Sequence, residues 1–233
     1  MAKSVIIGSR TRMDGITSLR YFKGYARARH GARRMSNRAN PFEWSGGHPA
    51  LDLVNTLDER PSGAPIENLA TYHDLTRFAA LAGLIDRRTA AGLERLDSRS
   101  GSTVVKSARR LREHLHDVLA AANSGRSARQ PDLDALSAAI RAAHAARKLV
   151  ASPSPGLADR RWSPALAREI PLHACSLAIE CLLVGEDRKR IRKCGAADCD
   201  VYYLDTSKGR RRQWCSMKGC GNREKQRRWR GVA

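Results

Sequence analysis

The chain has 233 residues, of which 42% are hydrophobic and only 5% aromatic, and its formal net charge is +20 at pH 7. This length allows one domain of ordinary size with a small second module, built on an aliphatic core. No run of roughly 18 apolar residues occurs, which excludes a transmembrane helix and predicts a soluble protein without a membrane partner. We expect no secretory signal, and therefore a reducing, cytoplasmic location.

The positive charge is concentrated at the two ends of the chain. Residues 1–34 contain nine Lys and Arg against one Asp, and residues 188–233 contain 15 Lys and Arg against four acidic residues. A C-terminal segment of this charge density attracts phosphates through counterion release. The charge alone therefore favours a nucleic-acid partner, with a solvated basic tail as the alternative.

Residues 1–34 show no sustained hydrophobic period and are predicted to be a disordered basic leader. Their Arg-rich, acid-poor composition also fits an organelle transit peptide. We expect instead that Met35 starts the native protein and that the leader is not part of it. An intact mass counted from Met1 would contradict this expectation.

Residues 35–186 are predicted to form a mainly α-helical domain. A loop at 42–49 leads into a short buried helix that carries Leu53 and Leu57, and a Pro- and Gly-containing segment, 61–65, ends it. Apolar residues three and four apart predict further helices over 72–82, 86–96, 104–122 and 131–143.

The last helix of this domain is expected over 164–184, with Ser163 as its N-cap. It is apolar on nearly every side, which is typical of a central helix, and Pro171 should kink or restart it. Its two cysteines, Cys175 and Cys181, are predicted to be small core residues. A short hairpin is expected before it, between residues 148–151 and 160–162.

The other four cysteines lie near the C-terminus as two pairs, each with the spacing C-x4-C. Each pair can turn two thiolates toward one point, and two pairs supply the ligands of a tetrahedral zinc site. We therefore predict one structural Zn²⁺ held by Cys194, Cys199, Cys215 and Cys220, with two disulfides as the alternative. No His follows His173, so the mixed, open coordination of a catalytic zinc is not expected.

Residues 187–233 are predicted to fold as a small zinc finger made of a β-hairpin and a helix. Strands are expected over 201–204 and 212–214, joined by a turn at 206–209. Asn222 or Gly221 is expected to cap the helix, whose N-terminal amides suit a phosphate. Because its core is small, the segment should need the metal for folding.

Basic residues of the hairpin and of the helix are the candidate nucleic-acid contacts, and a merely solvated helix face is the alternative. Three of the candidates share one helical face, and the whole set is Arg210, Arg211, Arg212, Arg223, Lys225, Arg227, Arg228 and Arg230. Trp214 and Trp229 are predicted to pack around the finger rather than to stack on bases.

Polar residues of the first helices are candidates for a second site. We predict a ligand pocket at His48, Asp52 and Asn55, because polar groups beside a buried helix need partners or a ligand. Together with His73 and Asp74, these residues are also candidates for catalysis. No nucleophile elbow, phosphate loop or metal-binding His pair is present, so we expect no enzymatic activity.

Two motifs resemble known families. The run Cys-Gly-Asn-Arg at 220–223, after the two cysteine pairs, resembles the CGNR zinc finger of bacterial proteins. The stretch Gly-Gly-His-Pro-Ala-Leu-Asp-Leu-Val-Asn-Thr at 46–56 resembles the start of the ABATE domain that precedes this finger. The resemblance covers residues 40–230 and implies a stress-induced transcription regulator, with a signal-sensing helical domain and a DNA-binding finger.

We therefore expect a bacterial transcriptional regulator that binds double-stranded DNA through its zinc finger. The helical domain would sense an unknown small-molecule effector or mediate homodimerisation, because a single finger offers few base contacts. Two alternatives stay open, namely an RNA- or ribosome-associated zinc protein and a protein–protein interaction module.

Overall fold

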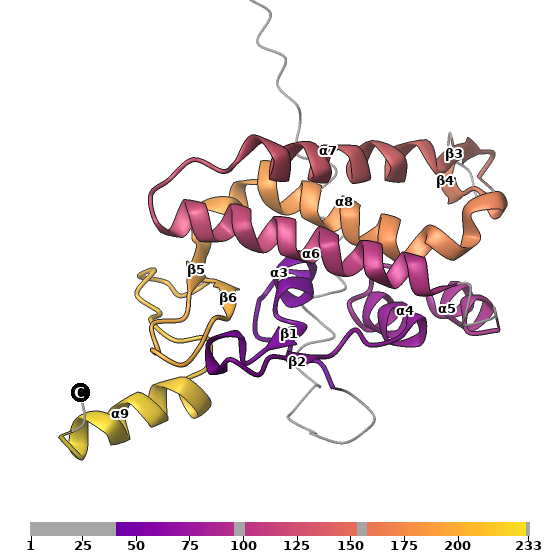
Figure 1. The fold of residues 1–233 in the computed structure, drawn as a ribbon. Helices are drawn as coiled ribbons and strands as arrows, with labels where there is room; N and C mark the ends of the chain where they lie inside the picture. The colour runs from indigo at the N-terminus through magenta and orange to yellow at the C-terminus, as the bar shows by residue number, and fades with distance from the viewer. Residues whose placement is uncertain (1–40, 96–100, 153–157, 232–233) are drawn as a thin grey trace, which may run out of the picture.

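The structure, a computed structural model, describes residues 41–95, 101–152 and 158–231. The predicted leader at 1–34 and the predicted start at Met35 lie outside the described residues. Within them the fold is mainly α-helical, with a C-terminal region of small strand pairs, as predicted (Figure 1). None of the helices in these ranges is long and apolar enough to cross a membrane.

Three helices form the centre of the fold, namely α6 (Ser102–Asn123), α7 (Gln130–Ala145) and α8 (Ile170–Val184). They lie side by side in Figure 1, and each contacts the other two. α6 and α7 bury one face each, as the spacing of their apolar residues predicts. α8 is central, because ten of its 15 residues are buried, and Cys175 among them belongs to the core as predicted.

The chain enters α8 through a break. A 3-10 helix, η3 (Pro164–Glu169), precedes it, and α8 restarts at Ile170 with Pro171 in its first turn. Proline is tolerated there because a first-turn N–H has no partner within the helix, so the predicted restart is confirmed. Ser163 is the N-cap residue of η3 and Pro164 follows it, as predicted, but the Ser163 side chain makes no cap hydrogen bond.

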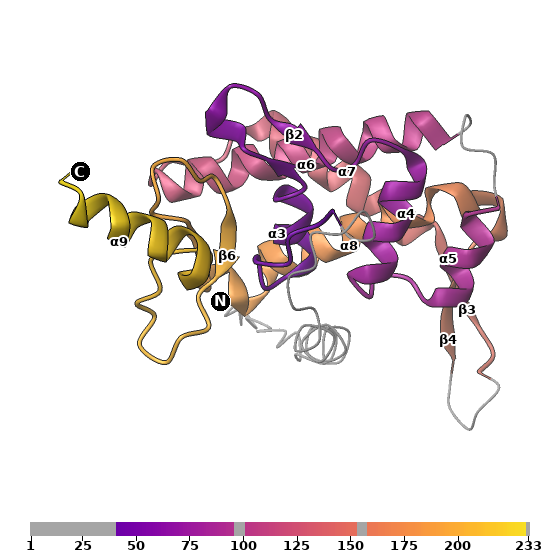
Figure 2. The same cartoon turned by 90° about the horizontal axis from the view of Figure 1, so that it is seen from below.

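Shorter elements cover one side of the three central helices (Figure 2). They are α3 (Pro49–Val54), β1 (Leu57–Asp58), η1 (Arg60–Ser62), β2 (Ile66–Glu67), α4 (Tyr72–Leu81) and α5 (Arg87–Leu93). α4 begins with a capping box between Thr71 and Asp74, and α5 is capped by Asp86, whose carboxylate accepts the Thr89 N–H at 2.7 Å. At the far end of the bundle, β3 (Arg147–Val150) and β4 (Asp159–Trp162) form the expected hairpin.

The C-terminal region consists of short elements. They are η4 (Glu186–Arg190), β5 (Ile191–Lys193), β6 (Tyr202–Leu204), a π-helical turn η5 (Met217–Gly221) and α9 (Asn222–Trp229). β6 pairs antiparallel with β5, with Ile191 opposite Leu204. The predicted hairpin between residues 201–204 and 212–214 is therefore wrong, because the partner of β6 comes before it in the chain.

Asp205 accounts for this difference. Its carboxylate accepts hydrogen bonds from the Ser207 N–H at 2.9 Å and hydroxyl at 2.6 Å, and from the Arg212 N–H at 3.1 Å. These bonds hold the chain after β6 as a loop. The carbonyl of Gln213 then accepts the N–H of Gly195 at 2.9 Å, so this segment pairs with the first cysteine knuckle instead of with β6.

β6 joins two cores. Tyr202 and Leu204 are buried in the core of the helical region, whereas Tyr203 lies between them in sequence and packs with the cysteines. Successive side chains of a strand point to opposite faces, so one short strand serves both cores. The C-terminal region is thus packed directly against the helices.

Candidate metal centre and basic surface

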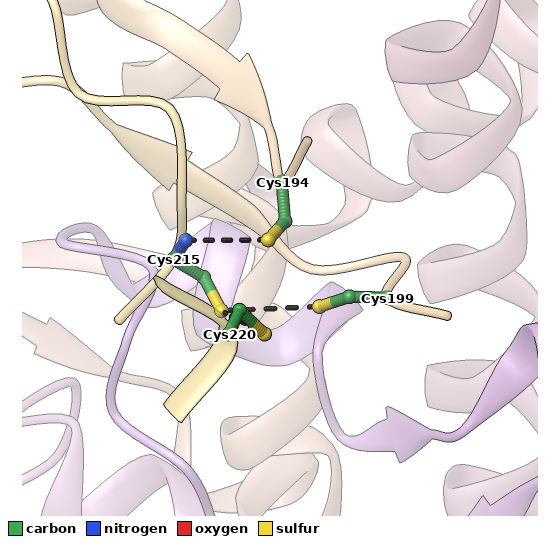
Figure 3. A group of neighbouring side chains, drawn as sticks. All are labelled: Cys194, Cys199, Cys215 and Cys220. Carbon is green, nitrogen blue, oxygen red and sulfur yellow. Dashed lines mark hydrogen bonds between the residues drawn. The ribbon is translucent and has the colours of Figure 1, made fainter. Parts of the chain in front are cut away.

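The four C-terminal cysteines converge on one point (Figure 3). Their sulfur atoms all lie within 4.8 Å of one another, with 3.8 Å between the Sγ atoms of Cys199 and Cys215 and 3.5 Å between those of Cys215 and Cys220. Four sulfurs placed about 2.3 Å from a zinc ion in a regular tetrahedron lie about 3.8 Å apart. The arrangement therefore fits a single structural zinc site with four thiolate ligands.

The folds of the two knuckles explain how these thiols come together. Cys194 directly follows β5, and its sulfur accepts the backbone N–H of Cys215 at 3.4 Å. In the second knuckle, the Ser216 hydroxyl caps η5 by accepting the Gly219 N–H at 3.2 Å, and η5 then carries Cys220. All four cysteines are free thiols in the structure, which favours metal ligation over the two disulfides left open by the sequence.

Arg223 lies against the metal centre. Its guanidinium donates to the Cys220 sulfur at 3.2 Å and to the Asp198 carboxylate at 2.9 Å. A zinc ion with four thiolates carries a net charge of −2, so a cation at this distance stabilises it. Arg227 also donates to Asp198, at 2.8 Å, and a second bond joins it to Glu224 at 2.8 Å. These contacts tie α9 to the first knuckle.

Arg212 is likewise engaged within the finger. Its guanidinium lies 4.2 Å from the centre of the Tyr203 ring and donates to the carbonyl groups of Trp214, at 2.9 Å, and of Cys215. Tyr203 in turn donates its hydroxyl to the Arg212 carbonyl at 2.6 Å. Arg212 therefore links the loop after β6 to the second knuckle.

The eight candidate nucleic-acid residues thus fall into two groups. Arg212, Arg223 and Arg227 hold the finger together, whereas the other five form no ion pair among the described residues. Those five are Arg210, Arg211, Lys225, Arg228 and Arg230. They give the finger a positive surface that no carboxylate in the described chain neutralises.

The start of α9 differs from the prediction. Gly221 is its N-cap residue, one of the two expected, but it has helical backbone angles and no side-chain cap. The Asn222 N–H donates to the carbonyl of Met217 in η5, so α9 continues from the π-helical turn. The N–H groups of Gly221 and Asn222 are therefore engaged by η5 and not free for a phosphate.

The predictions for the two tryptophans have different outcomes. Trp214 packs against the cysteine cluster as predicted, but Trp229 is 88% exposed, so its predicted packing around the finger is wrong. Within the finger lies an open cleft of about 330 Å³, lined by Arg192, Lys193, Trp214, Glu224 and Arg228 among others.

The structure places the predicted pocket residues at the junction between the helices and the finger. The Asn55 amide donates to the Tyr202 carbonyl at 2.9 Å and accepts the Tyr202 N–H at 3.0 Å. Asp52 accepts the Gly46 N–H at 2.7 Å, and the Gly46 carbonyl accepts the N–H of Leu204 at 2.7 Å. A Cβ at Gly46 would lie 2.8 Å from the Asp52 carboxylate, which explains the glycine.

His48 begins the same segment. Its Nδ1 accepts the Ala50 N–H at 3.2 Å as the N-cap of α3, and burial lowers its pKa to about 4. Burial raises the pKa of Asp52 well above its usual range. All three predicted residues are thus buried in the part of the helical region that contacts the finger. Their role as a ligand pocket stays a prediction.

Asp200 provides a second link between the regions, which the sequence did not reveal. It accepts a hydrogen bond from His116 of α6 at 2.7 Å, pairs with Lys193 and lies 3.9 Å from Arg60. The contacts with His116 and Arg60 join residues more than 80 positions apart, so no local pattern marks them.

A helical region followed by a basic finger with a four-thiolate metal site defines a two-part protein of the zinc-finger class. Residues 47–186 match the family model of ABATE, described as "putative stress-induced transcription regulator", and residues 190–231 match that of the CGNR zinc finger. The chain therefore belongs to the ABATE family and carries a C-terminal CGNR zinc finger. A comparison with curated proteins finds no match.

Proposed function

We propose that the protein is a transcriptional regulator that binds DNA through the zinc finger. The observation that carries this proposal is the set of five basic side chains on the finger that have no carboxylate partner in the described chain. Unpaired cations on a metal-supported module favour a polyanionic partner, since each phosphate contact releases counterions from the nucleic acid. The family description agrees with a regulator.

We propose that the helical region controls how the finger is held. Asn55 and Asp200 connect the two regions by hydrogen bonds, and β6 contributes to both cores. A change in the helical region, such as binding of an effector near His48 and Asp52, would therefore shift the finger. Dimerisation through the helices would bring two fingers to one operator, which specific regulation requires because one finger makes few base contacts.

The test uses the full chain with its zinc. Retention of a duplex DNA probe is measured between 50 and about 200 mM salt, before and after removal of zinc by a chelator. We expect about one zinc per chain and salt-sensitive retention that chelation abolishes. Retention that survives complete removal of zinc would contradict a role for the finger.

Competition identifies the nucleic acid. An excess of unlabelled duplex DNA should displace the probe more effectively than structured RNA at the same salt concentration. If RNA competes better, the RNA- or ribosome-associated alternative replaces the regulator. If the zinc-loaded chain retains neither, the finger is a protein-contact module.

A further inference from the structure

Trp229 has an unusual position for a tryptophan. It is the single apolar side chain of α9 and, at 88% exposure, the most exposed large hydrophobic residue in the described part of the chain. α9 projects away from the helical region in both views, with its C-terminal end outermost (Figures 1 and 2). Tryptophan side chains are mostly buried, so one held at the end of a projecting helix indicates a contact surface.

The surroundings of Trp229 are cationic. Lys225 lies one helical turn before it, and Arg228 and Arg230 flank it; none of the three forms an ion pair among the described residues. The acidic residue of the helix, Glu224, is engaged by Arg227 at 2.8 Å. A partner for this surface must therefore be anionic and must also offer a flat apolar face to the indole ring.

A nucleobase on its phosphate backbone combines these two properties. Aromatic side chains stack on unpaired bases while neighbouring cations hold the phosphates. A membrane fits less well, because an interfacial helix needs a broad apolar face and α9 has one apolar residue. Arg228 also lines the cleft with Arg192 and Lys193, and the acidic residue of its lining, Glu224, is paired with Arg227. Phosphates therefore have a positive path beside the same helix.

We propose that Trp229 is a base-stacking residue and that the finger prefers DNA with an unpaired segment, such as a locally opened duplex. This proposal rests on the proposed function, since it assumes that the finger binds nucleic acid. It assigns contact with the ligand to the outer side of α9, around Lys225 and Trp229, and Arg228 faces the cleft next to it. The inner side, with Arg223 and Arg227, serves the metal centre instead.

The experiment compares two DNA duplexes of the same length and charge, one fully paired and one with a short unpaired bubble at its centre. Stacking on one base changes affinity by roughly fivefold to hundredfold, so we expect the zinc-loaded full chain to bind the bubble about tenfold more tightly. Trp229→Ala should abolish this preference and leave affinity for the paired duplex unchanged. Trp229→Phe, which keeps an aromatic ring, should retain much of it.

Salt dependence separates stacking from charge. Trp229→Ala removes no cation, so the slope of log affinity against log salt should stay as in the wild type. Arg228→Gln should reduce that slope by about 0.9 on duplex DNA, because one phosphate contact is lost. Leu149→Ala removes another exposed apolar side chain, 70% exposed on β3, and should change neither quantity.

Three outcomes decide the matter. Equal binding of the paired and bubble duplexes by the wild type overturns base stacking and leaves DNA binding intact. Retention of the bubble preference by Trp229→Ala overturns the assignment to Trp229. Failure of the wild type to bind either duplex contradicts the proposed function itself, and a search for an acidic protein partner would follow.

Discussion

The helical region and the finger are stabilised in different ways. The helical region has a continuous apolar core that runs from α3 to α8, whereas the finger core contains five buried residues, three of which are cysteines. Burial of apolar surface is the main stabilising contribution for the first. A core of five residues cannot supply the same contribution, so the second depends on its metal.

The two regions also differ in how their charged residues are paired. In the helical region, the buried Arg112 makes two hydrogen bonds to Glu67, at 2.7 Å each, and one to Glu113 at 2.8 Å. In the finger, five of the candidate contact residues lack such a partner among the described residues. The buried pairing of Arg112 supports the helical fold, whereas the five unpaired cations of the finger are exposed and can meet an anionic ligand.

Removing the metal should produce the largest difference in stability between the two regions. Zinc binding contributes on the order of 10 kcal/mol to small zinc modules, so Cys215→Ser should release zinc and unfold residues 194–221 while α6 to α8 remain folded. Zinc content and amide hydrogen exchange measure both effects. Cys181→Ser, a half-buried cysteine outside the site, should keep the zinc. Unchanged exchange protection of the knuckles in Cys215→Ser would contradict metal-dependent folding.

Loss of Asn55 should separate the two regions. Asn55→Ala leaves the N–H and carbonyl of Tyr202 buried without their partner, at a cost of about 4 kcal/mol for the two groups together. Urea unfolding measures the loss, and hydrogen exchange should rise at β6 first. Asn123→Ala, an exposed residue at the end of α6, serves as the control. Equal stability of the two variants would show that the regions do not depend on this contact.

Lowering the pH should destabilise the helical side of the junction. His48 has a pKa of about 4 when folded and 6.5 otherwise, so between these values the unfolded chain binds a proton that the folded chain does not. The stability from neutral His48 is fully present above pH 6.5 and falls by about 3 kcal/mol by pH 4.

Urea unfolding at pH 7 and pH 4 tests this contribution against His48→Asn, which retains a side-chain acceptor for the Ala50 N–H. Zinc release and the titration of Asp52 affect both chains, so the difference between them isolates His48. The variant should lose about 3 kcal/mol less than the wild type. Parallel losses in the two chains would contradict the contribution.

Substitution of Arg223 should have the smallest effect of these changes. It tests the division of α9 into a side that serves the metal centre and a side that is free for a ligand. Arg223→Ala removes the donor to the Cys220 sulfur and should weaken zinc affinity by about tenfold to hundredfold, because partners of metal ligands typically contribute this much. Competition with a chromogenic chelator measures the affinity. Lys225→Ala removes the same charge from the outer side and should leave zinc affinity unchanged while weakening DNA retention. Equal zinc affinities in the two variants would place Arg223 outside the metal centre.

Much of the helical architecture could be predicted from the sequence. Apolar residues three and four apart predicted α4, α6 and α7, because a helix with one buried face must repeat at this spacing. Asp86 and Pro171 marked the starts of α5 and α8 through local backbone chemistry. The cysteine cluster was predictable for a related reason, since two closely spaced pairs bring four thiols near one point with little help from the rest of the chain.

Two of the predictions that proved wrong depended on long-range contacts. The strand after the first knuckle was predicted to pair with residues 212–214, but it pairs with β5, and the hydrogen bonds of Asp205 hold the following segment in a loop. Trp229 was predicted to pack around the finger, but α9 projects away from the helical region and leaves this side chain 88% exposed.

The sequence by itself therefore determined the helices, the metal ligands and the concentration of positive charge, because these follow from spacing and composition along the chain. Only the tertiary structure decided that Asn55 joins Tyr202, that Arg223 and Arg227 serve the metal centre, and that Trp229 faces outward. The physical reason is that hydrogen-bond and ion-pair partners are chosen by which segments meet in space. Residues with the same chemistry in one short helix can therefore support the fold or remain free for a ligand.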